Sequence, residues 1–133
     1  MNANYMAELI YPELSYKIVG ILFKVHSKLG GKYQEKYYQR AVALALKEEG
    51  LSYEKEIVVD LTFNGEKIGK YFLDFLIEDK VVLELKATPR FNREDFRQVA
   101  AYLKAKKLKL GILANFRGEQ LTYKRILNSK VRM

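Results

Sequence analysis

Three side chains in two neighbouring predicted strands have the types and the spacing that could do chemistry. Glu84 and Lys86 are two residues apart in the apolar run of residues 81–85, and alternate side chains share one face of a strand. Asp74 interrupts a second apolar run, residues 72–77. Charged side chains are costly to bury without a purpose, so their place within apolar strands indicates a function.

The turn between the two strands decides whether these three side chains meet. A three-residue turn over residues 78–80 places Asp74 opposite Glu84 in an antiparallel pair, and opposite residues share a face. A two-residue turn would place Asp74 opposite Leu85 and break the site. We expect the three-residue turn, so that Asp74, Glu84 and Lys86 converge.

Two converged carboxylates repel each other and bind a divalent cation well. The chain has no cysteine and one histidine, which excludes thiolate and multi-histidine metal sites and leaves a hard ion, Mg2+ or its substitute Mn2+. Such an ion activates a bound water, and Lys86 beside it can orient that water or neutralise developing charge. This combination suits phosphodiester hydrolysis. The alternative is a surface ion pair between Glu84 and Lys86 on an edge strand.

Two predicted helices add further candidates. Glu35 falls within the apolar stripe at the start of the helix predicted over residues 35–49, where it either accepts backbone hydrogen bonds or completes a metal shell. Gln98 and Tyr102 are spaced i and i+4 on the helix predicted over residues 93–105. We expect them to face solvent or a groove, because they lie nearly opposite the core stripe. That expected stripe consists of Phe96, Val99, Ala100 and Leu103.

The net charge of +8 is unevenly distributed along the chain. Residues 1–85 hold 11 basic and 13 acidic side chains, whereas residues 86–133 hold 13 basic and 3 acidic side chains. This asymmetry indicates a polyanionic partner, most commonly nucleic acid, or else a solubilising face. The candidate contacts with nucleic acid lie around the third predicted helix and are Arg90, Arg93, Arg97 and Lys104.

The hydrophobic pattern predicts an α/β fold with a mixed sheet of about five strands, a three-stranded antiparallel meander plus returning strands, flanked by helices. Helices are predicted over residues 14–29, 35–49 and 93–105, and strands over residues 56–63, 67–77, 81–88, 109–115 and 120–126.

Length and composition limit the class of protein. A chain of 133 residues predicts a single domain over residues 1–133, with its core at about residues 14–128. No apolar run reaches the roughly 18 residues of a membrane span, so no membrane partner is expected. Residues 1–11 have no basic region typical of a secretory signal, and we expect a cytoplasmic protein.

Five segments, in order, resemble the PD-(D/E)xK nuclease superfamily, and most closely its small GxxExxY family. They are residues 25–30 (Val-His-Ser-Lys-Leu-Gly), residues 35–38 (Glu-Lys-Tyr-Tyr), Asp74 with residues 82–86 (Val-Leu-Glu-Leu-Lys), residues 98–104, and residues 110–116. The resemblance spans about residues 14–128. Lys32 stands where the motif has its glycine, and Asp95 stands where the family often has a histidine.

The resemblance implies a restriction-endonuclease-like core and a metal-dependent nuclease that acts on nucleic acid, DNA in preference to RNA. The residues implied to hold Mg2+ are Glu35, Asp74 and Glu84, with Lys86 assisting the attacking water and Gln98 and Tyr102 supporting the site and the nucleic acid. The alternative is a nucleic-acid-binding module of the same fold without catalysis. A homodimer is also compatible, because a core of this size has limited surface with which to grip a duplex.

Overall fold

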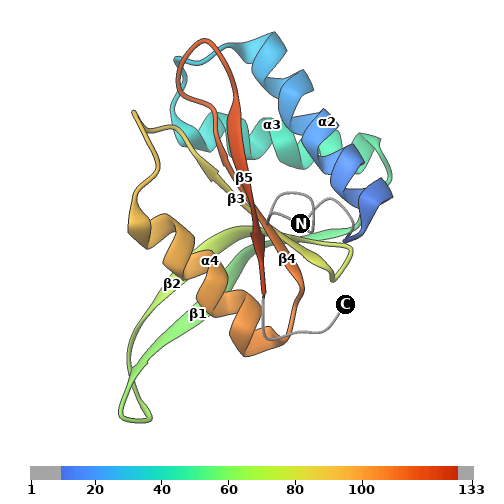
Figure 1. Cartoon of the computed structure of the whole chain (residues 1–133). Coiled ribbons are helices and arrows are strands. Elements are labelled where there is room, and N and C mark those ends of the chain that lie inside the picture. The colour runs from blue at the N-terminus through green and yellow to red at the C-terminus, as the bar shows by residue number, and fades with distance from the viewer. Residues whose placement is uncertain (1–9, 129–133) are drawn as a thin grey trace.

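The structure is a computed structural model that describes residues 10–128 of the chain. Within these residues, three helices and five strands follow one another in the predicted order (Figure 1). They are α2 (Pro12–Leu29), α3 (Glu35–Glu48), β1 (Tyr53–Phe63), β2 (Glu66–Ile77), β3 (Val81–Lys86), α4 (Arg93–Lys106), β4 (Leu110–Asn115) and β5 (Thr122–Leu127). No predicted end differs from the observed one by more than three residues.

The five strands form one mixed sheet in the order β1-β2-β3-β4-β5. Strands β1, β2 and β3 are the predicted antiparallel meander, and β4 returns parallel to β3 after the crossover through α4. Strand β5 then pairs antiparallel with β4. Every residue of β4 is buried, as expected for an apolar strand inside the sheet. The α/β class and the mixed sheet predicted from the sequence are therefore confirmed.

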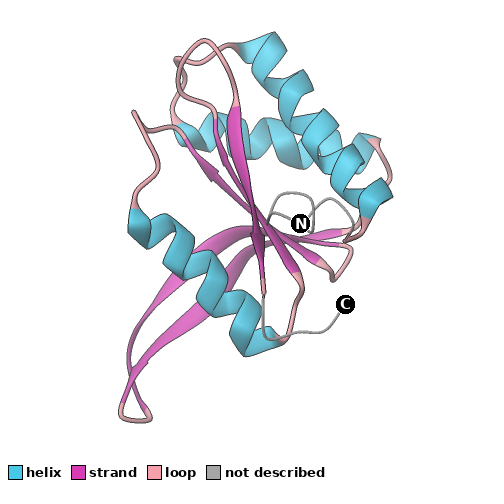
Figure 2. Ribbon diagram, viewed as in Figure 1, coloured by secondary structure: helices cyan, strands magenta, loops and turns pink. Residues whose placement is uncertain are grey.

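Helices cover both faces of the sheet (Figure 2), and the sheet separates the core into two clusters. Helices α2 and α3 pack on one face, and the larger cluster there includes Ile18, Leu46 and Leu83. Helix α4 packs on the other face, where Val99 and Leu103 meet Val82 of β3. Alternate residues of β3 serve opposite clusters, because successive side chains of a strand point to opposite faces.

The close packing of α4 on the sheet depends on a glycine of β4. A Cβ atom on Gly111 would lie 2.6 Å from Cγ1 of Val99 and 3.5 Å from Cδ1 of Leu103. The absence of a side chain therefore lets this face of α4 approach the strand. The side of α4 that carries Val99 and Leu103 is therefore the side that packs on β4.

Strand β2 changes its packing at Asp74. Phe75 belongs to the cluster beneath α2 and α3, whereas Leu73, two residues earlier, belongs to the cluster beneath α4. Regular alternation would place both on the same face. The partner position on β1 is Glu56, which lies between the pairs that Phe75 and Leu73 form and has a positive φ of 53°. Asp74 thus occupies a local distortion of the meander, where side-chain directions are reset.

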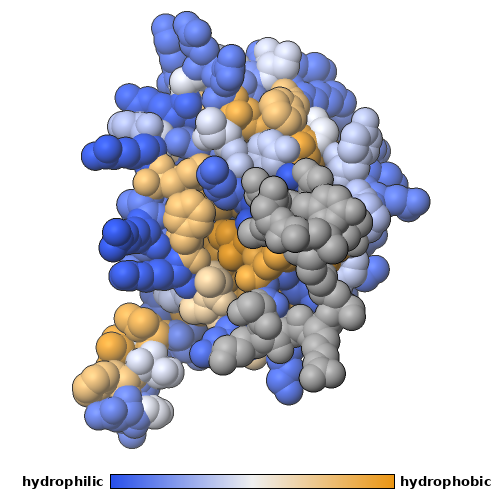
Figure 3. Space-filling model, viewed as in Figure 1, coloured by the Kyte–Doolittle hydropathy of each residue, from blue (hydrophilic) through white to orange (hydrophobic). Residues whose placement is uncertain are grey.

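Beyond this distortion, β1 and β2 continue as a long hairpin that projects from the body of the molecule (Figure 1). Exposed apolar side chains gather on it, among them Leu61, Phe63 and Ile68 (Figure 3). In residues 10–128, no helix is both long and apolar enough to cross a membrane.

Candidate active site

Asp74 and Glu84 meet where β2 and β3 separate. The ladder between the strands ends at the pair Phe75–Leu83, in the register that a turn over residues 78–80 predicts. One step further, the backbone N–H of Asp74 donates to Glu84 Oε1 at 3.0 Å, and the backbone N–H of Leu85 donates to Asp74 Oδ2 at 2.8 Å. Side-chain carboxylates therefore satisfy the backbone groups where the ladder ends, and both acids are held at one fork in the sheet.

The proximity of the two carboxylates disfavours the ionisation of both. Glu84 is only 5% exposed, and burial, followed by the charge of Asp74, raises the pKa of Glu84 from its ordinary 4.5 to about 9. Burial likewise raises the pKa of Asp74, opposed by its hydrogen bonds and by Lys86. A cation bound between the two carboxylates would offset their repulsion and favour the ionised form of both. Each carboxylate oxygen also keeps a lone pair that its hydrogen bond does not use.

Lys86 lies between Glu84 and Asp95. Its Nζ is 3.5 Å from Glu84 Oε2 and 3.5 Å from Asp95 Oδ1. Burial acts to lower the pKa of Lys86, but the surrounding carboxylates, Glu84 first, outweigh it and raise that pKa. Lys86 therefore stays an ammonium ion, which can balance negative charge or orient a water but cannot accept a proton.

Asp95 connects this lysine to the start of α4. Its backbone N–H donates to Asn92 Oδ1 at 3.0 Å, and its Oδ2 accepts from the backbone N–H of Asn92 at 3.1 Å. This reciprocal pair is a capping box, which satisfies two backbone donors at a helix N-terminus. The other carboxylate oxygen of Asp95, Oδ1, faces Lys86. One side chain thus fixes the helix end and the lysine together.

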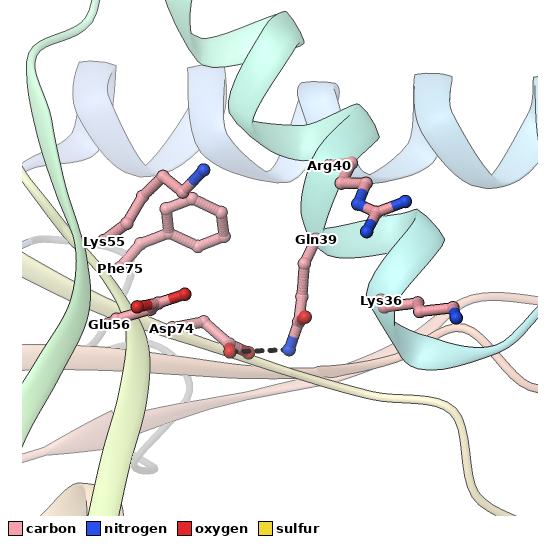
Figure 4. Close-up of a pocket in the computed structure, with 7 residues that line it drawn as sticks. All are labelled: Lys36, Gln39, Arg40, Lys55, Glu56, Asp74 and Phe75. Atoms are coloured by element: carbon pink, nitrogen blue, oxygen red, sulfur yellow. Dashed lines mark hydrogen bonds between the residues drawn. The ribbon is translucent and has the colours of Figure 1, made fainter.

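Glu35 approaches the site from the first turn of α3, where it is half-buried. Gln39, one turn later, bridges it to Asp74: its Nε2 donates to Glu35 Oε2 at 3.3 Å and to Asp74 Oδ1 at 2.8 Å, the bond that Figure 4 shows. Burial raises the pKa of Glu35, with Lys86 opposing and Asp74 adding to the rise. Glu35 is therefore electrostatically part of the site.

The three predicted metal ligands nevertheless do not form one ready-made shell. Among residues 10–128, no three acidic or imidazole side chains are grouped closely enough to hold one ion. Asp74 and Glu84 are adjacent, whereas Glu35 reaches Asp74 through Gln39. The structure thus shows a carboxylate pair, with Glu35 joined to it through the amide of Gln39, and the three-ligand site stays a prediction. This still fits Mg2+, which keeps several waters and commonly takes one or two protein carboxylates plus substrate phosphates.

The loop before α3 is anchored to the far end of the sheet. Tyr38 is fully buried, stacks on Phe116 with centroids 4.4 Å apart, and donates from its hydroxyl to the carbonyl oxygen of Gly30. Gly31 passes so close to Gly118 that a Cβ would lie 1.8 Å from the Gly118 carbonyl oxygen. This packing fixes the direction in which α3 begins, and so the position of Glu35.

A pocket of about 290 Å³ opens beside Asp74, between α3 and β1. Figure 4 shows Gln39 of α3 reaching toward Asp74, with Lys55 and Glu56 on the strand side, whereas Lys36 and Arg40 extend from the helix away from those two residues. Three of its lining side chains are basic: Lys36, Arg40 and Lys55. All three come from the part of the chain whose net charge is slightly negative. Basic character next to the carboxylates is thus a product of folding rather than of the C-terminal charge excess.

Tyr102 does not lie where the sequence predicted. It is 5% exposed and packs in the cluster beneath α4, between Val99 and Leu103 in sequence, while Ala100 is exposed. Val99 and Leu103 pack against Gly111 as part of the buried stripe, and this stripe is rotated from the predicted one so that it includes Tyr102 in place of Ala100. A groove-facing Tyr102 is corrected to a core residue.

Gln98 is half-buried, and the contact that the structure gives it is through its backbone: its carbonyl oxygen accepts from the Tyr71 hydroxyl at 3.3 Å. Within the described part of the chain, no hydrogen bond or ion pair joins Gln98 or Tyr102 to Asp74, Glu84 or Lys86. The structure therefore does not include this pair among the contacts of the site.

The four predicted nucleic-acid contacts on and before α4 are exposed: Arg90, Arg93, Arg97 and Lys104. None of them lines the pocket at Asp74. Arg90 instead lines a second depression with Asn115, Arg117 and Lys124, at the β4–β5 side of the molecule. Lys130 and Arg132, which contribute to the C-terminal charge excess, lie outside the described residues.

Two polar residues of the site were not predicted from the sequence. Gln39 had a signal, since it lies four residues after Glu35 and so on the same helix face. Asp95 also had a signal in the sequence, because Asn92 and Asp95 have the spacing of a capping box. A capping box marks the start of a helix, and this helix begins shortly after Lys86. Both were hidden because their partners are far away in the chain.

Comparison with family models gives a match to the PD-(D/E)XK nuclease superfamily over residues 12–126. Curated proteins and solved structures gave no match. The matched segment includes all the residues that meet at the candidate active site: Glu35, Asp74, Glu84, Lys86 and Asp95. Fold, order of elements and family model therefore agree: the chain belongs to the PD-(D/E)XK nuclease superfamily.

Proposed function

We propose that the protein is a metal-dependent nuclease that hydrolyses phosphodiester bonds of nucleic acid, with DNA as its preferred substrate. The observation that carries the proposal is the pairing of Asp74 with Glu84 at the fork, with Lys86 3.5 Å from Glu84 Oε2. Members of this superfamily are generally nucleases that use divalent metals such as Mg2+.

In this proposal Asp74 and Glu84 hold Mg2+ through carboxylate lone pairs that their hydrogen bonds leave free. When bound, the ion lowers the pKa of a coordinated water and polarises the phosphoryl oxygen. Gln39 orients Asp74 by donating to Oδ1, in the way that outer hydrogen bonds fix the orientation of metal ligands. Glu35 lies close enough to Asp74 and Lys86 to alter their charge balance.

Lys86 acts as a fixed cation. As an ammonium ion held by Glu84 and Asp95, it can stabilise the negative charge that develops on the phosphate as water attacks phosphorus and the ester P–O bond breaks. The water's proton leaves toward solvent or a phosphate oxygen rather than to Lys86. Asp95 is a positioning residue, because it acts through Lys86.

The experiment is cleavage of single- and double-stranded DNA and RNA with Mg2+ or Mn2+, beside the variants Asp74→Ala and Lys86→Ala. We expect cleavage by the unaltered protein and none by either variant. Cleavage that survives in both variants would locate the activity elsewhere. Binding without cleavage, weakening steeply with salt, would instead support a non-catalytic nucleic-acid-binding module.

Membership of the GxxExxY family belongs to the same proposal, supported by residues 25–30 and by Glu35 with Tyr38. A cytoplasmic location and a homodimer stay predictions.

A further inference from the structure

An exposed aromatic pair lies on the outer surface at the start of α3, next to the candidate active site. Tyr37 is 42% exposed and Tyr33 is 51% exposed. Their rings meet edge to face, with centroids 6.0 Å apart and planes at 71°. Two cations flank Tyr37: Lys36 Nζ is 5.3 Å and Arg40 Cζ is 5.8 Å from the ring centroid.

The same two cations connect Tyr37 to the carboxylates. Lys36 and Arg40 line the pocket that contains Asp74, and both also contact the Tyr37 ring. Gln39 lies between them in sequence and donates to Asp74. Around α3, at about 100° per residue, the order is therefore Gln39 at the site, then Lys36 and Arg40, then Tyr37. The path from the fork to the aromatic ring therefore passes about 160° around α3, by way of Lys36 and Arg40.

The aromatic pair is held in place by the core. The backbone N–H of Tyr33 donates to the hydroxyl of buried Tyr38 at 3.2 Å, and the rings of Tyr33 and Tyr38 also meet edge to face at 6.4 Å. Tyr38 in turn stacks on buried Phe116. Tyr33 thus has a fixed backbone and supports Tyr37 from one side. Side chains ordered in advance lose less conformational entropy when a ligand binds.

We propose that Tyr37 is a stacking platform for an unpaired base, and that Lys36 and Arg40 bind the phosphates that join this base to the phosphate at Asp74. The inference rests on the proposed nuclease function and deepens it: the substrate is a single strand, or a strand unpaired next to the scissile bond. A base within a duplex has both faces covered by its neighbours and cannot stack on a protein ring.

The magnitudes favour exchange of the cations for the base. A base stacked on an aromatic side chain gains more than a single exposed cation–π contact does, and two such contacts, from Lys36 and Arg40, are given up for it. Lys36 and Arg40 gain phosphate contacts when they leave the ring, and they have flexible stems that reach both positions. The two cations therefore cover the ring in the free protein but can leave it when a base binds.

The test uses the fact that the chain contains no tryptophan. Tyr37→Trp, in an Asp74→Asn background that prevents cleavage, provides one fluorophore at the platform. We expect a single-stranded oligonucleotide of about 12 nucleotides to quench it by stacking. The blunt duplex of the same sequence should quench it at least several-fold less at equal saturation. DNA and RNA strands are compared separately.

Tyr16→Trp in the same background is the matched control. Tyr16 is 80% exposed near the start of α2, whereas α3 begins beyond the other end of that helix. We expect no quenching there. Equal quenching at both positions, or equal quenching of Tyr37→Trp by duplex and single strand, would overturn the proposal.

A second variant pair tests the cations. Lys36→Ala with Arg40→Ala should weaken single-strand binding and reduce the salt slope by about 1.4, which is about 0.7 per lost phosphate contact. Lys24→Ala with Lys28→Ala removes the same charge from exposed positions of α2 and should change neither. Equal effects of the two pairs would contradict a path along α3.

The outcomes separate this inference from the proposed function. Selective quenching by single strands, without any cleavage by the unaltered protein, would contradict the proposed nuclease function and support base stacking on Tyr37. Cleavage of duplexes, with no quenching of Tyr37→Trp, would support the nuclease function and contradict base stacking on Tyr37.

Discussion

The backbone N–H of Asp74 donates to Glu84 Oε1 at the first position beyond the β2–β3 ladder. In return, Asp74 Oδ2 accepts from the backbone N–H of Leu85. The two candidate metal ligands therefore also complete the sheet where its backbone pairing ends. Structure and chemistry depend on the same oxygens, so tests of function need substitutions that keep the hydrogen bonds.

Asp74→Asn and Glu84→Gln each remove the charge and keep one oxygen for the backbone N–H of Leu85 or of Asp74, although the asparagine then gives up the hydrogen bond from Gln39. We expect either to lower the cleavage rate by about 100-fold or more, since loss of a ligand should cost at least as much as loss of its outer support. Rates are measured on a labelled oligonucleotide with Mg2+, with circular dichroism to verify folding. A folded variant with the original rate would remove the carboxylate pair from the mechanism.

The stability of the metal-free protein should fall as pH rises from about 5 to about 9. The pKa of Glu84 is about 9 in the folded state and ordinarily 4.5. The folded protein thus binds more protons than the unfolded chain in this window, and stability is highest at the acidic end. The raised pKa values of Asp74 and Glu35 act in the same direction. Urea unfolding in EDTA across this range measures the slope.

Glu84→Gln is the control for this pH dependence, because glutamine does not titrate. Its unfolding free energy should vary much less with pH and exceed that of the unaltered protein at the alkaline end. Saturating Mg2+ should also oppose the loss, since metal binding favours the ionised carboxylates. Parallel slopes for the two proteins would assign the effect to other groups.

Asp95 and Asn92 form one capping box but differ in their contact with Lys86. Asn92→Ala should cost about 1 kcal/mol of stability and leave the cleavage rate within about two-fold. Asp95→Ala should cost at least as much and also lower the rate, because Lys86 loses a partner. Thermal unfolding and cleavage rates of both variants give the comparison. Equal rates would show that Asp95 serves the helix alone.

Gln39→Ala removes the amide that joins Glu35 to Asp74. We expect the dissociation constant for Mn2+ to rise about 10-fold, the lower end of the range for outer hydrogen-bond partners of metal ligands. Calorimetric titration with Mn2+ in the absence of nucleic acid measures it. Gln39→Glu should also weaken binding, because it loses the donor to Asp74, whereas tighter binding would indicate that the new carboxylate holds the ion. The direction therefore reports whether this side chain contacts the ion.

Tyr102 tests the rotated face of α4. Tyr102→Phe should change stability by less than about 1 kcal/mol and leave cleavage near its original rate, because the ring packs in the core and makes no contact with the fork. Tyr102→Ala should cost about 3–5 kcal/mol by leaving a cavity. A large loss of cleavage in a folded Tyr102→Phe variant would show that the Tyr102 hydroxyl takes part in the function of the site.

Some of this architecture could be predicted from the sequence because it depends on local rules. The polar turn over residues 78–80 set the register of β2 and β3, and with side chains alternating every two residues it placed Asp74 beside Glu84. Helix and strand order followed from hydrophobic period and turn residues. The face of α4 did not, because Ala100 and Tyr102 flank Val99 and Leu103 and both choices give an apolar stripe.

The residue types alone indicated which chemistry to expect: a chain without cysteine and with one histidine, whose acids and lysine interrupt apolar strands, predicts that any metal ion is a hard one held by oxygen. How these groups contact one another depends on the tertiary structure. Gln39 stands between Glu35 and Asp74, Asp95 holds Lys86, and basic residues of α3 and β1 border the carboxylates. The reason is physical: a residue's type is local, whereas its partners depend on contacts between segments far apart in the chain.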